Sequence, residues 1–294
     1  MDEFIKIKKL VGNTPLIEYK PNIYCKFEAY NPTGSIKDRI VFYIFDHAIK
    51  NNIIDISKNP MCIEASSGNT GISVSFVSSL LNCPSTIILP SNMSKERKQL
   101  ITLFGSKLNE VGDGDFDGAI KLRDTLCNAP NTFNVNQFHN LLNIECHYTT
   151  TGSEIIRQLN GKIPDVLISG TGTGGTIMGV GKRLKEINKN LKIIAVEPFE
   201  SPVMSGGKPG LHDIQGIGDG SKFLVDLDFV DDIIQIKSKD AIEKAKQLCK
   251  NGYYVGISAA SNCLAAEQYI KMNPNDVIVT FLCDRGDRYI SMLK

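Results

Sequence analysis

Short apolar runs and longer runs with helical spacing alternate along nearly the whole chain of 294 residues. The short runs have the length and apolar content of buried β-strands, and the segments between them repeat apolar residues every three or four positions. Such alternation is typical of the α/β class, with mainly parallel sheets covered by helices. We predict strands over Cys62–Ala65, Thr86–Leu89, Lys107–Val111, Thr132–Val135, Asp165–Ser169, Lys192–Val196, Asp232–Ile236 and Val277–Leu282.

Two domains are predicted, because eight strands exceed what one compact sheet usually holds. Each domain would carry a twisted sheet, with a crevice between the two. We place the boundary near residue 145, after the strand ending at Val135 and before a helix predicted to start around residues 151–154. The predicted domains are residues 1–145 and 146–294, with the earliest residues free to cross into the C-terminal domain.

Residues 31–39, Asn-Pro-Thr-Gly-Ser-Ile-Lys-Asp-Arg, predict a turn followed by a helix. Gly34 allows a sharp bend, and Ser35 followed by Asp38 has the pattern of a capping box, so the helix should start at Ser35. Its buried face would carry the apolar residues Ile40, Val41, Ile44, Phe45, Ala48 and Ile49.

Lys37 would lie in the first turn of that helix, where the helix dipole disfavours a cation. The dipole and partial burial should lower the pKa of Lys37, as a lysine that forms a Schiff base requires. Most lysines, however, are solvated surface residues. Other motifs must therefore decide the role of Lys37.

Residues 64–71, Glu-Ala-Ser-Ser-Gly-Asn-Thr-Gly, follow a predicted strand and open a helix. Backbone N–H groups and hydroxyls gather at such a helix N-terminus, which is a ready site for a carboxylate or a phosphate. An ordinary strand-to-helix turn has the same composition. Taken alone, this loop leaves both interpretations open.

Residues 169–176, Ser-Gly-Thr-Gly-Thr-Gly-Gly-Thr, also follow an apolar strand and predict a phosphate cradle. Gly170, Gly172 and Gly175 match the dinucleotide fingerprint as well, with Glu197 about 20 residues further on, where a ribose-binding acid lies. An NAD-dependent dehydrogenase is therefore an alternative. It gives no role to Lys37, whereas a pyridoxal phosphate enzyme needs a lysine, a phosphate cradle and a carboxylate site together.

Composition narrows the partners to small molecules. The net charge is +1, from 33 basic and 32 acidic residues, which gives no electrostatic reason to expect nucleic acid or an anionic membrane. No apolar stretch approaches about 18 residues and the N-terminus is acidic, so we expect a cytoplasmic protein. The eight cysteines form no CxxC pair and have no histidine at ligand spacing, so we expect no metal.

Two later segments are candidates for contacts to a cofactor ring. Residues 256–261 start a predicted helix, and residues 282–289 follow the last predicted strand. Either could bring a neutral donor to a pyridine nitrogen, although each is also an ordinary helix start or strand end.

Together these motifs resemble the cysteine synthase (O-acetylserine sulfhydrylase) family of tryptophan-synthase-β-like pyridoxal phosphate enzymes. The resemblance runs from Val11 to about Ile290 and keeps the family's order of motifs. Its most specific parts are residues 31–39, Ser-Gly-Asn-Thr-Gly at 67–71, Met-Ser-Lys-Glu-Arg at 93–97, Gly-Thr-Gly-Gly-Thr at 172–176 and Gln-Gly-Ile-Gly at 215–218. The ending at 283–289 is similar to the B-type isozymes, whereas residues 215–218 are closer to the A type.

The resemblance implies a role for each matching residue. Lys37 would form the Schiff base with pyridoxal 5'-phosphate, Asn69 would contact the ring oxygen, and Ser258 would face the pyridine nitrogen with Cys283 nearby. The phosphate would be held by Gly172, Thr173, Gly174, Gly175 and Thr176. The substrate carboxylate would be bound by Ser66, Ser67, Gly68, Thr70 and Gln137. The family more often has threonine in place of Ser66, but a hydroxyl is kept.

The implied activity is a β-replacement that makes L-cysteine from O-acetylserine and sulfide, with Lys37 removing and returning the Cα proton. A homodimer, domain closure over the substrate and docking of a serine acetyltransferase are also implied. Alternatives within the family are O-phosphoserine as donor, cystathionine synthesis from serine and homocysteine, and release of sulfide from cysteine. We expect the neutral ester as donor, because Asp219 would repel a phosphate while Lys222 and Arg285 would attract one.

Overall fold

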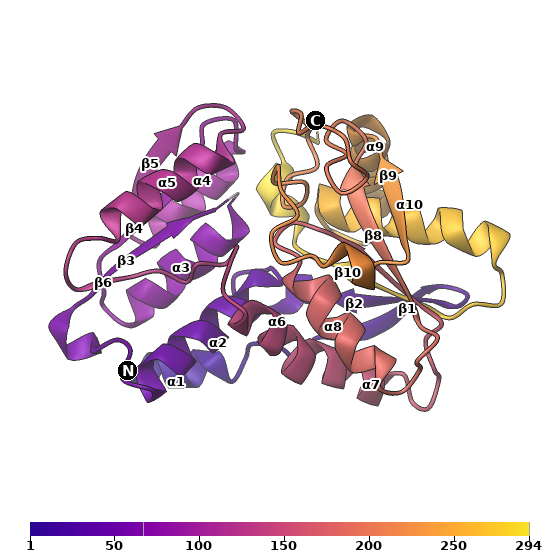
Figure 1. Cartoon of the computed structure of the whole chain (residues 1–294), viewed down its shortest axis with the longest axis horizontal. Coiled ribbons are helices and arrows are strands. Elements are labelled where there is room, and N and C mark those ends of the chain that lie inside the picture. The colour runs from indigo at the N-terminus through magenta and orange to yellow at the C-terminus, as the bar shows by residue number, and fades with distance from the viewer. Residues whose placement is uncertain (67, 294) are drawn as a thin grey trace.

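The computed structural model describes residues 1–66 and 68–293, which contain two β-sheets (Figure 1). The larger sheet has the strand order β1-β2-β10-β7-β8-β9, and the smaller has the order β5-β4-β3-β6. The strands of the larger sheet are β1 (Leu16–Lys20), β2 (Ile23–Phe27), β7 (Val166–Gly170), β8 (Lys192–Pro198), β9 (Asp232–Ile236) and β10 (Ile278–Leu282). Those of the smaller are β3 (Met61–Ala65), β4 (Ser85–Pro90), β5 (Lys107–Val111) and β6 (Thr132–Phe133).

Helices cover both sheets, which confirms the predicted α/β class. The α-helices are α1 (Asp2–Lys8), α2 (Lys37–Lys50), α3 (Asn69–Leu80), α4 (Lys95–Leu103), α5 (Phe116–Leu126), α6 (Leu142–Cys146), α7 (Ser153–Gln158), α8 (Gly175–Lys185), α9 (Ser238–Lys250) and α10 (Ile257–Met272). Short 3-10 helices are η1 (Glu28–Tyr30), η2 (Ile56–Lys58), η4 (Leu227–Phe229) and η5 (Gly286–Tyr289), and η3 (His147–Gly152) is a π-helix.

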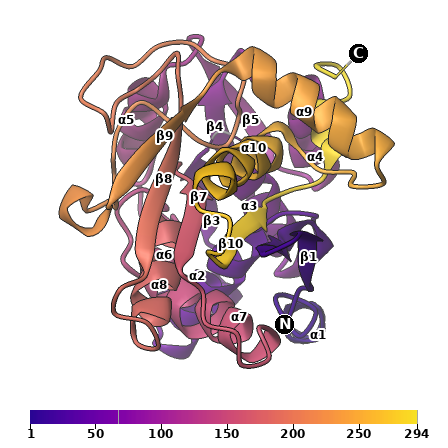
Figure 2. The ribbon, with the colours of Figure 1, turned by 90° about the vertical axis from the view of Figure 1, so that its right-hand side faces the viewer.

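Alternating side chains of the larger sheet enter two separate cores. Val166, Ile168 and Ile194 pack on the side of α9 and α10, whereas Leu167 and Ile193 pack on the side of α7 and α8. Figure 2 shows α9 and α10 beside this sheet. This arrangement follows from the period of two along a strand, which sends successive side chains to opposite faces.

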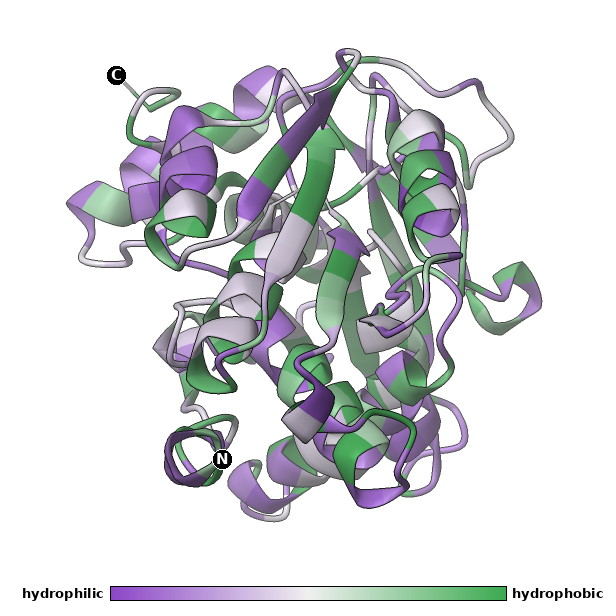
Figure 3. Cartoon of the chain, turned by 90° about the vertical axis from the view of Figure 1, so that its left-hand side faces the viewer, coloured by the Kyte–Doolittle hydropathy of each residue, from purple (hydrophilic) through white to green (hydrophobic). Residues whose placement is uncertain are grey.

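The smaller sheet is buried at its centre and exposed at one edge. Every residue of β4 is buried, but β5, an edge strand, exposes three of its five residues. The colours in Figure 3 show the same contrast between apolar central strands and polar outer segments. Among the described residues, no helix is long and apolar enough to cross a membrane.

All eight predicted strands are present, with ends that agree to within two residues. The sequence analysis missed β1 and β2, which pair with each other in antiparallel fashion and join the larger sheet through the parallel pair β2–β10. Residues before position 28 thus share a sheet with strands after position 166. The domain boundary near residue 145 stays a prediction.

The predicted start of the Lys37 helix is wrong by two residues. Helix α2 begins at Lys37, and Ile36 precedes it without a side-chain cap. The carboxylate of Asp38 instead accepts hydrogen bonds from the N–H and the hydroxyl of Thr33, both at 2.6 Å. Asp38 therefore closes the turn that precedes the helix, while the Ser35 hydroxyl accepts from the Lys37 N–H at 3.3 Å.

The helix predicted to start around residues 151–154 is instead the end of a longer helical segment. α6, the π-helix and α7 follow one another without a break from Leu142 to Gln158. The π-helix packs tightly on α8, since a Cβ added to Gly179 would lie 2.7 Å from the Cβ of His147. π-Helical turns are often found at functional sites.

Candidate active site

One cavity brings together most of the residues predicted to bind a cofactor. Its lining comes from the start of α2, the start of α3, the loop between β7 and α8, the start of α10 and the end of β10. The predicted residues that line it are Lys37, Asn69, Gly172, Thr173, Gly174, Thr176, Ser258 and Cys283. Gly175 lies just behind, as the first residue of α8.

The loop before α8 has the donors of an anion site. The backbone N–H groups of Gly172, Thr173, Gly174 and Thr176 donate to no acceptor within the described residues. The Gly175 N–H reaches only the Thr173 hydroxyl, at 3.4 Å. Unpartnered N–H groups at a helix N-terminus are the donors that bind phosphate. This donor set therefore fits the phosphate of pyridoxal phosphate.

The glycines of this loop are required by close packing. Gly174 has φ +89°, and a Cβ there would lie 2.8 Å from the Val225 backbone nitrogen. A Cβ on Gly175 would lie 1.9 Å from the side-chain oxygen of Asn143, and one on Gly172 would lie 2.8 Å from the Gly216 carbonyl oxygen. Any side chain at these positions would push apart the walls of the loop.

Lys37 lies at the N-terminus of α2, at the cavity wall, and is partly buried. Its ammonium group makes no hydrogen bond or ion pair in the described part of the chain. Burial lowers the pKa of Lys37, and the neighbouring carboxylates of Asp219 and Asp284 oppose that shift. The predicted lowering of the Lys37 pKa is confirmed. A larger fraction of neutral amine makes this lysine a better nucleophile for an aldehyde.

Ser258 and Cys283 offer neutral groups to the same cavity. Ser258 is 3% exposed in the first turn of α10. Burial raises the pKa of the Cys283 thiol to about 12, so the thiol carries a proton at neutral pH. Neither residue brings a charge to the cavity wall that they share.

The predicted substrate loop is folded onto itself. The Ser66 hydroxyl accepts from the N–H groups of Gly68 and Gly71, each at 2.9 Å. The Thr70 hydroxyl donates to the side chain of Gln137 at 2.5 Å, and Gln137 donates to the Ala65 carbonyl at 3.0 Å. Ser66, Thr70 and Gln137 are buried. Ser67, also predicted here, lies outside the described residues.

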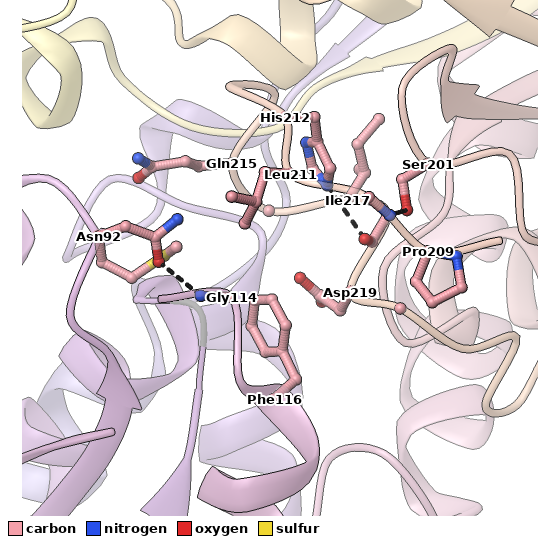
Figure 4. Close-up of a pocket in the computed structure, with 15 residues that line it drawn as sticks. Asn92, Gly114, Phe116, Ser201, Pro209, Leu211, His212, Gln215, Ile217 and Asp219 are labelled. Atoms are coloured by element: carbon pink, nitrogen blue, oxygen red, sulfur yellow. Dashed lines mark hydrogen bonds between the residues drawn. The ribbon is translucent and has the colours of Figure 1, made fainter. Parts of the chain in front are cut away.

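A second cavity, of about 220 Å³, adjoins the first and shares Gly216 and Ile217 with it (Figure 4). Met93 and Phe116 come from the side of the smaller sheet, and Leu211 and Asp219 come from the other side. Asp219 is 5% exposed, and burial raises its pKa. Lys222 and Arg285, in contrast, are exposed and line neither of these two cavities.

Residues behind the phosphate loop were missed by the sequence analysis. Asn143 donates to the Thr173 hydroxyl at 3.0 Å, and the ring of His147 lies between the hydroxyls of Thr176, at 3.2 Å, and Thr151, at 2.9 Å. Burial holds the pKa of His147 well below its usual range, so the ring is neutral. No local pattern indicates these contacts, because they arise from the packing of α6 and the π-helix on α8.

Glu197, considered above as a ribose-binding acid, has a structural role. It is 1% exposed, and its carboxylate accepts from the Met204 N–H at 2.8 Å and from the Ser205 hydroxyl at 2.5 Å. These contacts occupy both carboxylate oxygens. They argue against dinucleotide binding at residues 170–175.

Comparisons with known proteins support the same interpretation. The family model described as pyridoxal-phosphate dependent enzyme matches residues 7–284. Cysteine synthase B of Campylobacter jejuni is 40% identical over 294 residues, which cover 97% of each chain. A hydrogen sulfide-producing enzyme from Fusobacterium nucleatum has a TM-score of 0.91 at 40% identity, over 99% of this chain and 91% of that one. A cysteine synthase from Entamoeba histolytica has a TM-score of 0.88 at 34% identity, over 97% and 89%.

The loop of residues 172–176 has four N–H groups without an acceptor among the described residues. These donors and the family match favour the pyridoxal phosphate interpretation of this loop over the dinucleotide one. The identities of 34 to 40% extend over nearly the full length of the relatives. The chain therefore belongs to the pyridoxal-phosphate dependent enzymes and, within them, to the cysteine synthase family.

Proposed function

We propose that this chain makes L-cysteine by a β-replacement in which sulfide displaces the acetate of O-acetylserine. The observation that carries the proposal is the shared cavity, where a lysine of lowered pKa faces a loop with unpartnered N–H groups. A lysine and a phosphate site in one cavity serve a cofactor that has both an aldehyde and a phosphate.

Each wall of the cavity would hold one part of pyridoxal phosphate. Residues 172–176 would bind the phosphate, Lys37 would bond the aldehyde carbon, Asn69 would contact the ring oxygen, and Ser258 would face the pyridine nitrogen with Cys283 nearby. When bound, the cofactor withdraws electrons from the substrate's α-carbon. A neutral Ser258 leaves the pyridine nitrogen unprotonated, which favours prompt loss of the β-substituent.

Lys37 would also move the proton. The Lys37 amine, when not bonded to the cofactor, would take the Cα proton of the substrate and later return it. Its lowered pKa leaves more of the amine neutral and able to act as a base. Ser66, Ser67, Gly68, Thr70 and Gln137 would bind the substrate carboxylate and so hold the Cα–H bond toward Lys37.

The charges around the second cavity support the neutral ester as donor. Asp219 is buried in the lining, whereas Lys222 and Arg285 are exposed and Arg285 pairs with Asp287 at 3.1 Å. A carboxylate about 4 Å from a phosphate charge costs on the order of 1–4 kcal/mol, depending on exposure to water. We expect kcat/KM to be higher for O-acetylserine than for O-phosphoserine.

A second candidate function uses a larger nucleophile. The second cavity, at about 220 Å³, has more space than sulfide requires. It could admit an amino-acid thiol, whose sulfur would bond the substrate's β-carbon as the leaving group departs, which gives a thioether. The same cavity would accept cysteine as donor with sulfide as leaving group, and one neighbour is named a hydrogen sulfide-producing enzyme.

Two measurements test the proposal. Borohydride reduction of the holoenzyme, followed by peptide mapping, should label Lys37 and no other lysine. Kinetics with O-acetylserine and sulfide, compared with O-phosphoserine as donor and with homocysteine or cysteine as nucleophile, should rank the first pair highest. Label on another lysine would overturn the cofactor assignment, and a higher kcat/KM for another pair would overturn the substrate assignment.

A homodimer, a location in the cytoplasm and docking of a serine acetyltransferase belong to the same proposal. They are supported by the family resemblance. Light scattering of the purified protein measures whether it is a dimer, and co-elution with a serine acetyltransferase tests the docking.

A further inference from the structure

The segment after β10 contains buried charges that the proposed function does not use. Asp284 and Arg288 have 0% exposure, and so does Arg97, which reaches Asp284 from α4. Buried charges are costly unless they are paired and hydrogen-bonded. Two of the contacts that these residues make converge on one side chain in the cavity, that of Asn69.

The amide of Asn69 is held from both sides. Its nitrogen donates to Oδ2 of Asp284 at 2.7 Å, and its oxygen accepts from Nε of Arg288 at 2.8 Å. A carboxylate accepts and a guanidinium donates, so the two neighbours permit one orientation of the amide. We name these three residues the amide clamp.

The clamp leaves one donor for the cavity. An amide nitrogen carries two N–H bonds, and Asp284 takes one of them. The second has no acceptor in the described part of the chain, and Asn69 lines the cavity beside Lys37 and Ser258. Asn69 is therefore fixed as a donor, which suits an anionic ring oxygen and would not suit a protonated one.

Further contacts hold the clamp in place. The Tyr289 hydroxyl donates to the same oxygen of Asp284 at 2.7 Å, and Arg97 lies 3.5 Å from that oxygen. Arg288 also donates to the Thr33 carbonyl in the turn before Lys37. The clamp thus joins α3, the last segment of the chain and the turn that precedes α2.

We propose that Asp284 and Arg288 are positioning residues, which act through Asn69 to present an N–H donor to the ring oxygen of the cofactor. This rests on the proposed function, because it assumes pyridoxal phosphate in the cavity. The contribution of the clamp is orientation: without Asp284, the amide of Asn69 could turn its oxygen to the cavity and repel an anionic ring oxygen.

The double variant Asn69→Asp with Asp284→Asn, called the exchange variant, distinguishes a role in orienting the donor from a role in stabilising the fold. It keeps one carboxylate and one amide, and Asp at 69 can still accept from Arg288 and from the amide at 284. It removes the donor that faces the cavity, and it also removes the acceptor of the Tyr289 hydroxyl, because the atom of residue 284 that faces position 69 must now donate. We expect the melting temperature to fall by roughly a few degrees through the loss of the Tyr289 hydrogen bond. The Kd for pyridoxal phosphate should rise about ten- to a hundredfold, since one hydrogen bond to a charged group is lost.

Titration of the apoprotein with pyridoxal phosphate gives the Kd, and a pH titration of the visible absorption band reports the environment of the ring oxygen. In the exchange variant the band should shift and change its pH dependence. The single variant Asp284→Asn should give an intermediate effect, since its amide can pair with Asn69 in two ways.

Asp287→Asn is the matched control. It removes a carboxylate that lies 3.2 Å from Arg288 but does not touch Asn69, so the Kd and the band should stay as in the wild type. If the exchange variant binds with wild-type Kd and spectrum, or if the control changes them equally, the inference is wrong. If the wild type itself fails to bind pyridoxal phosphate, the proposed function fails instead.

Discussion

The two glycine-rich loops of this enzyme both open a helix, yet their donors are used differently. In residues 172–176, four backbone N–H groups face the cavity without an acceptor in the described chain. In the loop before α3, Ser66 accepts from the N–H groups of Gly68 and Gly71, and Thr70 is bonded to Gln137. The donors of the first loop are available to an anion, whereas those of the second loop are hydrogen-bonded within the protein.

This difference between the loops agrees with how long each proposed ligand stays bound, the cofactor through many turnovers and the substrate through one. Donors without partners destabilise an empty site, so they suit a cofactor that remains bound. Donors that are paired internally cost little in the empty enzyme, but they must exchange partners each time a substrate carboxylate arrives. On the proposed roles, the loop of residues 172–176 is preorganised for the cofactor, and the loop before α3 would rearrange to bind the substrate.

Gly174→Leu should give the largest effect, because it changes the preorganised loop. A Cβ at this position already lies 2.6 Å from a Val225 methyl group, so the loop must open. We expect the Kd for pyridoxal phosphate to rise at least about a thousandfold, as three charge-assisted hydrogen bonds of about 1.5 kcal/mol each are lost. Gly206→Leu is the control, with φ +85° and open space around it. Full cofactor occupancy in Gly174→Leu would place the phosphate elsewhere.

Glu64, which lies beside the loop before α3, should make the free energy of unfolding depend on pH without affecting cofactor binding. Its carboxylate accepts from the Asn136 N–H at 2.8 Å, next to Gln137, and burial raises the pKa of Glu64 to about 7. The folded state therefore binds this proton more tightly than the unfolded chain. The resulting stability is fully present below about pH 4.5 and is lost as the pH rises through about 7.

The variant Glu64→Gln removes that dependence. Between about pH 4.5 and 8, the wild type should lose about 2–3 kcal/mol of unfolding free energy relative to Glu64→Gln. Urea unfolding of both apoproteins at several pH values measures the difference. The ratio of their Kd values for pyridoxal phosphate should stay constant, because residues 172–176 contain no titratable side chain. A ratio that varies with pH would show that the two loops are coupled.

Features encoded by local pattern could be predicted from the sequence, as the eight strands and both glycine-rich loops illustrate. Features that depend on a residue far away in the sequence could not be predicted. β2 contains Lys26, which looks polar in the sequence but is fully buried, because Glu154 lies 2.8 Å from its ammonium group. The acceptor that orients Asn69 lies 215 positions further along the chain. Such pairs become visible only when the fold joins them.

Thr70→Val tests whether the loop before α3 affects binding of the substrate but not of the cofactor. The change keeps the size of the buried side chain but removes the hydroxyl that donates to Gln137. We expect KM for the amino-acid substrate to rise about tenfold, the effect of one lost hydrogen bond of about 1.4 kcal/mol, with an unchanged Kd for pyridoxal phosphate. Thr102→Val is the control, because among the described residues the Thr102 hydroxyl donates only to carbonyls of α4. An equal loss of cofactor affinity in Thr70→Val would remove the distinction between the loops.

Ser66→Ala should give the smallest change in catalysis, because two consequences oppose each other. The variant loses one hydroxyl that could bind the substrate carboxylate, but it frees the N–H groups of Gly68 and Gly71 for the same carboxylate. We expect KM to change less than about threefold, while the unfolding free energy falls by about 1 kcal/mol because the two hydrogen bonds accepted by the Ser66 hydroxyl are lost. Steady-state kinetics and thermal unfolding measure the two quantities. A tenfold rise in KM would show that the Ser66 hydroxyl itself binds the substrate, and that the N–H groups do not replace it.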